Sequence, residues 1–354
     1  MKIAIILGTR PEIIKMSPII RECEKQGIEY YILHTGQHYS YEMDKIFEQL
    51  KLPQAKYNLD VGSGLHGKQT AKMLARIEEI LIKDRPDVVL VQGDTNTVLA
   101  GALAASKLQI KIGHIEAGLR SFDRTMPEET NRIIADHISD YLFAPTETSR
   151  KYLLNEGIPE EKIFVTGNTV VDAAYQNLEI SKNGADILEE LGLKEKQYFA
   201  ATAHRAENVD SKERLGGILN GFSQIYKEFS LPIIFPAHPR TVKMIGEFGF
   251  KVPEGTRLIE PLGYLEFLQL ESGARLILTD SGGVQEESCI LKVPCVTLRD
   301  NTERPETVDV GANLIAGCGE NIIECARKMI ESDCEWEKPY GNGDSAELTL
   351  GKLQ

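Results

Sequence analysis

Asp280-Ser-Gly-Gly-Val-Gln-Glu-Glu287 is the stretch that decides how we interpret the fold and where we expect a ligand. The apolar run 275–279 before it is typical of a buried parallel strand, and the residues after it can continue as a helix. The two glycines would let a phosphate approach the backbone N–H groups at the helix start, because no Cβ stands in the way. The two glutamates that end the stretch could accept hydrogen bonds from a ribose diol. An ordinary strand-to-helix turn with a glycine kink explains these residues equally well.

Length and charge limit the class of protein. A chain of 354 residues is long enough for two domains that each bury a core. Forty basic against 53 acidic residues give a net charge of -13, which argues against nucleic acid or an anionic membrane as a partner. The six cysteines form no C-x-x-C pair, and the apolar run 2–7 is too short for a signal peptide or a membrane span. We therefore expect a cytoplasmic protein.

Apolar runs of strand length alternate with helical patterns along the whole chain. In the first half the expected strands are 2–7, 29–34, 88–92, 110–116, 141–145 and 163–166. In the second half they are 198–203, 233–236, 257–260, 275–279 and 295–298. This rhythm predicts an α/β protein with two Rossmann-like, doubly wound domains and a central cleft, divided as 1–168 and 169–339. In such sheets the ligand site lies beyond the carboxyl ends of the strands.

Basic residues follow the first predicted strand. Arg10 precedes Pro11, which suits the first turn of a helix, and Lys15 lies one turn further on. Together the two cations could clamp a diphosphate, although either one alone is more often a surface residue. The turn lacks the G-x-G-x-x-G pattern, which argues against a nicotinamide or flavin dinucleotide.

Three carboxylates follow later strands of the first half. Asp94 and Glu116 come directly after two predicted strands, and Glu128 stands at the start of the next predicted helix. Each one alone is most simply a helix cap or dipole partner. Three at one sheet edge would interact and shift one another's titration, as acid–base chemistry requires.

Two strand ends in the second half carry histidines. His204 and Arg205 follow one strand, and His238 follows the next. A single histidine is more often structural, but two at neighbouring strand ends favour a functional site. His204 and Arg205 together could neutralise a departing phosphate.

The stretch Gly62-Ser-Gly-Leu-His-Gly-Lys-Gln69 imitates a nucleotide-binding loop. It matches G-x-G-x-x-G and comes close to a Walker A motif, but Gln69 stands where that motif requires Ser or Thr. The residues before it, 57–60, make a poor strand. We therefore interpret it as a loop leading into a long helix.

Seven stretches, in order and over almost the whole chain, resemble the non-hydrolysing UDP-N-acetylglucosamine 2-epimerases. They are Gly8-Thr-Arg-Pro-Glu12, Gln92-Gly-Asp-Thr95, His114-Ile-Glu-Ala-Gly-Leu-Arg120, Pro127-Glu-Glu-Thr-Asn-Arg132, Thr166-Gly-Asn168, Asp280-Ser-Gly-Gly-Val-Gln-Glu-Glu287 and Thr302-Glu-Arg-Pro-Glu306. The resemblance implies a glycosyltransferase-B-like fold, a homodimer, and reversible conversion of UDP-GlcNAc to UDP-ManNAc with no cofactor and no metal. It also implies that a C-terminal tail, about 340–354, packs back on the first domain.

The resemblance also assigns roles to individual residues. It implies acid–base or catalytic roles for Asp94, Glu116, Glu128 and His204, and contacts with substrate or UDP for Arg10, Lys15, Arg205, His238, Ser281, Gly282, Gly283 and Glu287. Gln37 and His38 match a pair that builds an activating nucleotide-sugar site in bacterial members, but Tyr39-Ser-Tyr41 departs from the family pattern. A hydrolysing 2-epimerase that releases ManNAc and UDP, and a glycosyltransferase of the same fold, are the alternative functions.

Overall fold

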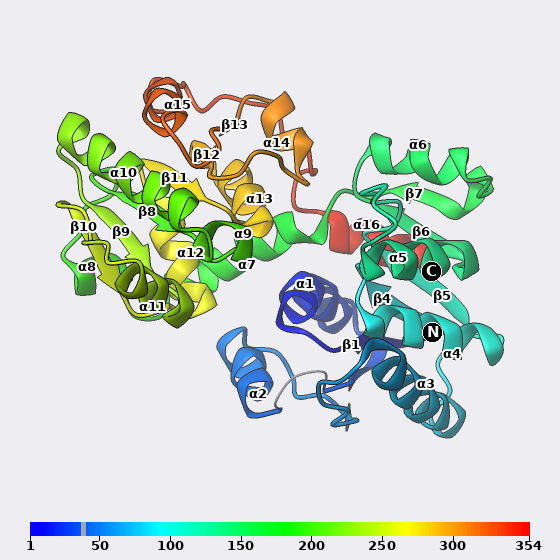
Figure 1. Cartoon of the computed structure of the whole chain (residues 1–354). Helices are drawn as coiled ribbons and strands as arrows, with labels where there is room; N and C mark the ends of the chain where they lie inside the picture. Colours follow the sequence, from blue (N-terminus) through cyan, green and yellow to red (C-terminus); the bar gives the residue numbers. More distant parts are fainter. Residues whose placement is uncertain (37–39) are drawn as a thin grey trace. The chain divides into compact units, whose positions relative to one another are not determined.

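The short apolar runs form the strands of two parallel sheets, as the sequence predicts (Figure 1). The structure, a computed structural model, describes residues 1–36 and 40–354. Unit 1 comprises Met1–Gln176 and Tyr340–Gln354, and unit 2 comprises Asn177–Pro339. The division lies inside helix α7 (Thr169–Ser181), whereas the sequence analysis placed a boundary at the start of that helix.

Unit 1 is built on a parallel sheet with the strand order β3-β2-β1-β4-β5-β6-β7. Its strands are β1 (Lys2–Leu7), β2 (Glu29–His34), β3 (Tyr57–Asn58), β4 (Val88–Gln92), β5 (Lys111–Ile115), β6 (Tyr141–Ala144) and β7 (Ile163–Val165). Its helices are α1 (Arg10–Gln26), α2 (Ser40–Gln49), α3 (His66–Lys83), α4 (Asn96–Lys107), α5 (Pro127–Ile138), α6 (Glu147–Asn155), the 3₁₀ turn η1 (Glu160–Lys162), most of α7, and α16 (Ser345–Leu353). The sequence analysis missed α2 and the two-residue edge strand β3.

Unit 2 repeats the plan with the strand order β10-β9-β8-β11-β12-β13. Its strands are β8 (Phe199–Thr202), β9 (Ile233–Pro236), β10 (Thr256–Ile259), β11 (Leu276–Thr279), β12 (Cys295–Thr297) and β13 (Asn313–Ile315). Its helices are α8 (Ile187–Leu191), α9 (Ala206–Val209), α10 (Lys212–Phe229), α11 (Pro239–Glu247), α12 (Tyr264–Gly273), α13 (Gly282–Ile290), α14 (Pro305–Asp309) and α15 (Asn321–Ile330).

The strand order of each sheet reverses once, and the point of reversal fixes where a ligand can bind. In unit 1 the order reverses between β1 and β4, and in unit 2 between β8 and β11. In open α/β sheets the loops on either side of such a point diverge and leave a crevice at the carboxyl ends of the strands. The residues that follow β1, β4, β8 and β11 are therefore the ones to examine.

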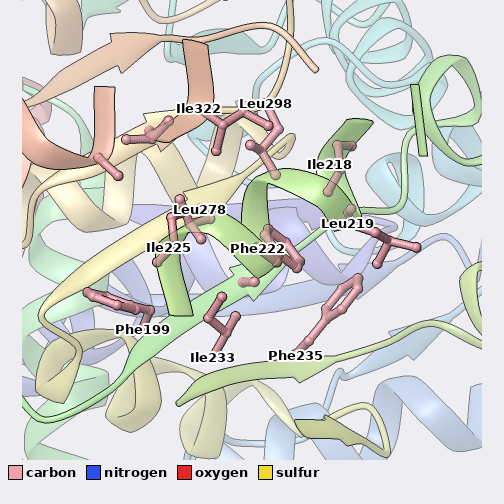
Figure 2. Packing of buried hydrophobic residues seen from close by; sticks show 14 of the residues in the cluster. Phe199, Ile218, Leu219, Phe222, Ile225, Ile233, Phe235, Leu278, Leu298 and Ile322 are labelled. Atoms are coloured by element: carbon pink, nitrogen blue, oxygen red, sulfur yellow. The ribbon is translucent and has the colours of Figure 1, made fainter. Parts of the chain in front are cut away.

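The core of unit 2 shows why these segments adopt their elements. Helix α10 buries apolar residues at helical spacing, so one face of the helix is apolar and packs on the sheet. Figure 2 shows this face packed against side chains of the strands, with Ile322 of α15 in the same cluster. The rings of Phe222 and Phe235 meet edge to face with centroids 5.8 Å apart. Burial of such side chains, at about 1.5–3 kcal/mol each, holds helix and strands together.

The segment that returns from unit 2 is anchored within unit 1. Helix α16 packs against α1, and both Ser345 and Ala346 donate backbone hydrogen bonds to the carboxylate of Asp172, at 3.3 and 3.0 Å. Burial raises the pKa of Asp172 to about 6. These contacts tie the last helix of the chain to the helix that leads out of unit 1.

The loop before α3 leads into a long helix, as the sequence analysis expected. Gln69 donates a hydrogen bond to the carbonyl of Gly62 at 2.9 Å, which ties the first turn of α3 to the loop. Within 1–36 and 40–354, no helix combines the length and the apolar character needed to cross a bilayer.

Candidate functional site

Glu116 lies just beyond the end of β5, where three side chains donate hydrogen bonds to its carboxylate. Its Oε1 accepts from Lys15 Nζ at 2.5 Å and from Asn168 Nδ2 at 3.1 Å, and its Oε2 accepts from Gln92 Nε2. Its backbone is left-handed, with φ of 68°, a conformation that non-glycine residues rarely adopt. Such strain persists only where the surroundings enforce it, and it is concentrated at functional sites.

His114, two residues earlier on β5, is held between two acceptors. Its Nδ1 donates to Asp136 Oδ1 and its Nε2 donates to the carbonyl oxygen of Gly93, both at 2.7 Å. A neutral imidazole has one N–H, so two acceptors require the charged, doubly protonated ring. Burial alone would lower the pKa of His114, but the charge and hydrogen bond of Asp136 outweigh burial and raise it. The imidazolium therefore fixes the peptide next to Asp94.

The other two predicted carboxylates of unit 1 stand after β4 and at the start of α5. Asp94 follows β4 and pairs with Arg132 of α5, and its carbonyl oxygen accepts from Asn131 Nδ2 at 2.9 Å. Glu128 is half-buried in the first turn of α5, and its carboxylate makes no hydrogen bond or ion pair among the residues whose side chains the structure describes. Helix α5 thus carries Glu128 and also anchors Asp94.

The predicted diphosphate clamp starts helix α1. Arg10 is exposed at the first position of the helix, with Pro11 next to it. Lys15 is largely buried and is paired with Glu116. The arrangement connects a cation that could hold a diphosphate with a carboxylate that could move a proton.

Glu12 of α1 is a buried carboxyl that closes the turn after β1. Its oxygens accept from the backbone N–H of Gly8 at 3.0 Å and from Thr95 Oγ1 at 2.8 Å. Burial raises the pKa of Glu12 to about 7, because the effect of burial is larger than the lowering of the pKa by the hydrogen bonds. The carboxyl thus holds the loop after β1 against the start of α4.

We expect the Glu12→Gln variant to lose a pH dependence that the native chain has. Because the pKa of Glu12 is raised to about 7 on folding from an ordinary value of 4.5, the native state retains a proton that the unfolded chain releases. Native stability should therefore fall by about 3 kcal/mol more than the variant's as the pH rises through this range. Urea midpoints at pH 5 and pH 8 measure the difference. The exposed Glu78→Gln is the control, and a variant with the native pH dependence would contradict the assignment.

In unit 2, a buried aspartate shapes the loop after β8. The carboxylate of Asp280 accepts hydrogen bonds from the backbone N–H of His204 and of Arg205, both at 2.9 Å, and from Asn208 Nδ2 at 3.1 Å. The imidazole of His204 is about half-exposed, with Nε2 3.8 Å from Asp280 Oδ1. The stretch quoted first in the sequence analysis therefore holds the predicted catalytic histidine in place through its backbone.

At the start of helix α13, the Ser281 hydroxyl makes no capping hydrogen bond and the N–H groups of the first turn have no partner within the helix. Ser281 is the N-cap residue of this helix. Gly282 and Gly283 form the first turn, where unpaired N–H groups and the helix dipole favour an anion.

His238 caps α11. Its Nδ1 accepts a hydrogen bond from the backbone N–H of Arg240 at 3.2 Å, so the ring proton is on the exposed Nε2.

A carboxylate already lies beside the start of α13. Glu303 Oε2 would be 3.6 Å from a Cβ added at Gly282, and it accepts from Arg299 at 2.6 Å. Glu303 Oε1 lies 3.5 Å from the guanidinium of Arg205. Burial would raise the pKa of Glu303, but the hydrogen bond and charge of Arg299 outweigh burial and lower it. The start of α13 therefore lies beside a carboxylate that is paired with two arginines.

Comparisons with known proteins identify the family of the chain. A family model described as UDP-N-acetylglucosamine 2-epimerase matches residues 21–354. A relative named UDP-N-acetylglucosamine 2-epimerase, from Methanocaldococcus jannaschii, is 59% identical over 99% of this chain and 100% of its own length. The chain belongs to the UDP-N-acetylglucosamine 2-epimerase family.

Solved structures of this epimerase family share the fold of the chain. A crystal structure of the Methanocaldococcus jannaschii UDP-GlcNAc 2-epimerase, in complex with UDP-GlcNAc and UDP, is 58% identical. The match covers 100% of this chain and 99% of the chain in that crystal structure, with a TM-score of 0.86. A relative from Pseudomonas aeruginosa, UDP-2,3-diacetamido-2,3-dideoxy-D-glucuronate 2-epimerase, is 42% identical over 98% of this chain and 97% of its own length. The family and the α/β fold predicted from the sequence are confirmed, and the chain is an isomerase of this family.

The site residues predicted from the sequence follow the carboxyl ends of strands or lie in the helices that begin there, each in its own unit. Within unit 1 these are Arg10, Lys15, Asp94, Glu116 and Glu128. Within unit 2 they are His204, Arg205, His238, Ser281, Gly282, Gly283 and Glu287. Gln37 and His38, the pair assigned to an activator site, lie outside the described residues. Glu286, which the sequence analysis offered to a ribose together with Glu287, is buried and paired with Arg304 at 2.9 Å.

The sequence analysis assigned no role to several residues that organise the site of this epimerase. Gln92, His114 and Asn168 stand in stretches quoted for the resemblance, yet their contacts with Glu116 or Gly93 emerged only from the structure. Their one signal in the sequence is a polar side chain at the end of an apolar run. That position predicts a place at the site but does not identify a partner.

Proposed function

We propose that the protein reversibly converts UDP-N-acetylglucosamine to UDP-N-acetylmannosamine by eliminating UDP to 2-acetamidoglucal and adding UDP back. The observation that carries this proposal is the 58% identity, over the whole chain, to an epimerase structure that holds UDP-GlcNAc and UDP. The carboxylates at the end of the unit 1 sheet supply the acid–base groups that this reaction needs. Its products and substrates, UDP-GlcNAc, UDP-ManNAc and UDP, are the ligands we expect.

The chemistry explains why both kinds of group are needed. The hydrogen at C2 of the sugar is not acidic, because no carbonyl is attached to stabilise a carbanion. Departure of UDP from C1 creates an oxocarbenium-like centre, which makes the C2 proton removable. In this scheme Arg10, Lys15 and the start of α13 stabilise the leaving diphosphate, and His204 with Arg205 stabilises its charge.

Inversion at C2 requires two proton carriers. The proton leaves from one face of the sugar and a proton returns to the other, which one fixed side chain cannot accomplish. Asp94, Glu116 and Glu128 supply three candidates from β4, β5 and α5. Glu116 is the carboxylate whose protein contacts are most numerous, so we place it at the sugar.

Incubation with UDP-GlcNAc in heavy water tests the proposal. We expect UDP-ManNAc carrying deuterium at C2, with traces of UDP and the glycal, when no acceptor is present. Free ManNAc would instead identify a hydrolysing epimerase, and turnover only with an added acceptor would identify a glycosyltransferase. Binding of UDP-GlcNAc without deuterium exchange at C2 would identify a nucleotide-sugar sensor. The substrate named for the Pseudomonas aeruginosa relative, offered in parallel, tests which sugar is preferred.

We also propose that the chain forms a homodimer, as its resemblance to the epimerase family implies. Light scattering at micromolar concentration should give twice the mass of the 354-residue chain. A mass equal to that of one chain would contradict this.

A further inference from the structure

The orientation of Glu116 depends on its neighbours more than on its own backbone. Its left-handed backbone is strained, and the residue is 7% exposed. A strained residue keeps one orientation only where its contacts over-determine it. Of the donors to this carboxylate, Lys15 is the cation that a diphosphate would also attract, whereas Gln92 and Asn168 are neutral and buried. The neutral pair is therefore suited to hold Glu116 while Lys15 changes partner.

Asn168 is itself fixed at every polar atom. Its Oδ1 accepts from Val170 N at 3.1 Å, which leaves Nδ2 to donate to Glu116 Oε1. Its backbone N–H donates to the carbonyl oxygen of Tyr340 at 2.9 Å. The amide therefore faces the carboxylate in one orientation, set by the start of α7 on one side and by Tyr340 on the other.

Tyr340 is the first residue of the segment that returns to unit 1. It packs so closely on Gly167 that an added Cβ there would lie 2.9 Å from the Tyr340 carbonyl oxygen. Gly167 has φ of 77°, and its own carbonyl accepts from Ser345 Oγ at 3.2 Å. Both passages of the chain between the units, through α7 and through Tyr340, thus meet at Asn168.

We propose that Asn168 is a positioning residue for Glu116, and that the returning segment at Tyr340 holds Asn168 in place. The proposal rests on the proposed epimerase function and deepens it. Its consequence is that a disturbance of the second passage between the units changes the proton-transfer step without touching a nucleotide contact.

Substitution of Asn168 tests the direct contact. We expect Asn168→Ala to lower kcat roughly 10- to 100-fold while the Kd for UDP stays within about twofold. Asn168→Asp places a second carboxylate against Glu116 Oε1, and like charges at that distance favour protonation. The pH profile of kcat should therefore move to higher pH in Asn168→Asp and not in Asn168→Ala. A merely structural role would lower kcat and UDP binding together and leave the profile in place.

Substitution of Gly167 tests the role of the returning segment. Gly167→Ala forces the Tyr340 carbonyl away, whereas Gly157→Ala, at φ of 82° with no atom within 4 Å, imposes the same backbone strain in open space. We expect about a tenfold loss of kcat in Gly167→Ala and none in Gly157→Ala. Thermal unfolding and UDP binding identify a variant that fails to fold.

Two results separate this proposal from the proposed function. If the native protein exchanges deuterium at C2, but Gly167→Ala matches Gly157→Ala and the Asn168→Asp profile does not move, the positioning role is wrong. If the native protein shows no exchange with UDP-GlcNAc, the epimerase function is wrong, and with it the role built on it.

Discussion

Replacing Glu116 by Gln should lower kcat by roughly 10²–10⁴ while UDP binding is retained. The amide has the shape of the carboxylate but cannot accept a proton, so a proton-transfer step loses its carrier. UDP affinity should stay the same or increase, because Lys15 no longer shares its charge with a carboxylate 2.5 Å away. Initial rates with UDP-GlcNAc and calorimetry with UDP measure the two quantities separately.

The matched control for this variant is Glu161→Gln, which removes one exposed carboxylate from the 3₁₀ turn η1. It should leave kcat unchanged. If Glu116→Gln instead lost UDP binding and kept its kcat, Glu116 would be a binding residue and not a proton carrier.

Replacing Asp136 by Asn should destabilise unit 1 by about 3–5 kcal/mol, because it leaves buried cations without their counter-charge. Asp136 accepts from His114 at 2.7 Å, pairs with Arg120 at 2.7 Å, and accepts from Gly118 N at 3.2 Å. Glu156 would still neutralise Arg120, so His114 bears most of the loss. Thermal unfolding of unit 1 should begin roughly 6–20 °C lower.

The pH dependence of the same pair has a definite sign. The charge of His114 lowers the pKa of Asp136, against the effect of burial, and this stabilising contribution disappears as the pH falls below 3.8 toward that lowered value. The pKa of His114 is raised, so its contribution is complete below 6.5 and disappears as the pH rises through the raised value. Native unit 1 should therefore lose more stability on the alkaline side than Asp136→Asn, which keeps only the losses that come from Glu12 and Asp172. Glu324→Gln, which breaks an exposed ion pair, should change little. Equal alkaline losses in native and variant protein would contradict the imidazolium.

The strand runs and the strand-end motifs could be predicted because both follow from short-range patterns. Burial on both faces makes a parallel strand apolar throughout, so the run 276–279 and its counterparts are visible in the sequence. The edge strand β3 could not be predicted from an apolar run, since its two residues, Tyr57 and Asn58, are not buried. Helix α2 and an edge strand of unit 2, β13 (Asn313–Ile315), were missed as well.

The partners within the site could not be predicted because they join residues far apart in sequence. The amide of Asn168 meets a carboxylate 52 positions away, and Asp280 reaches backward to backbone groups 75 and 76 positions earlier. Periodicity indicates which side chains are buried but not which polar atoms then meet. The double hydrogen bonding of His114 likewise depends on where Gly93 turns, which a pattern of residue types does not encode.

The return of the chain to unit 1 through Tyr340 has a consequence for synthesis on the ribosome. Unit 2 is an insertion within unit 1, so all of its residues emerge before the helix Ser345–Leu353 that packs on α1. During translation the inserted unit can complete its own core first, while the outer unit still lacks its last helix. Maturation of the Glu116 environment therefore has to wait for Tyr340, whose carbonyl holds Asn168 and which is added after the whole of unit 2.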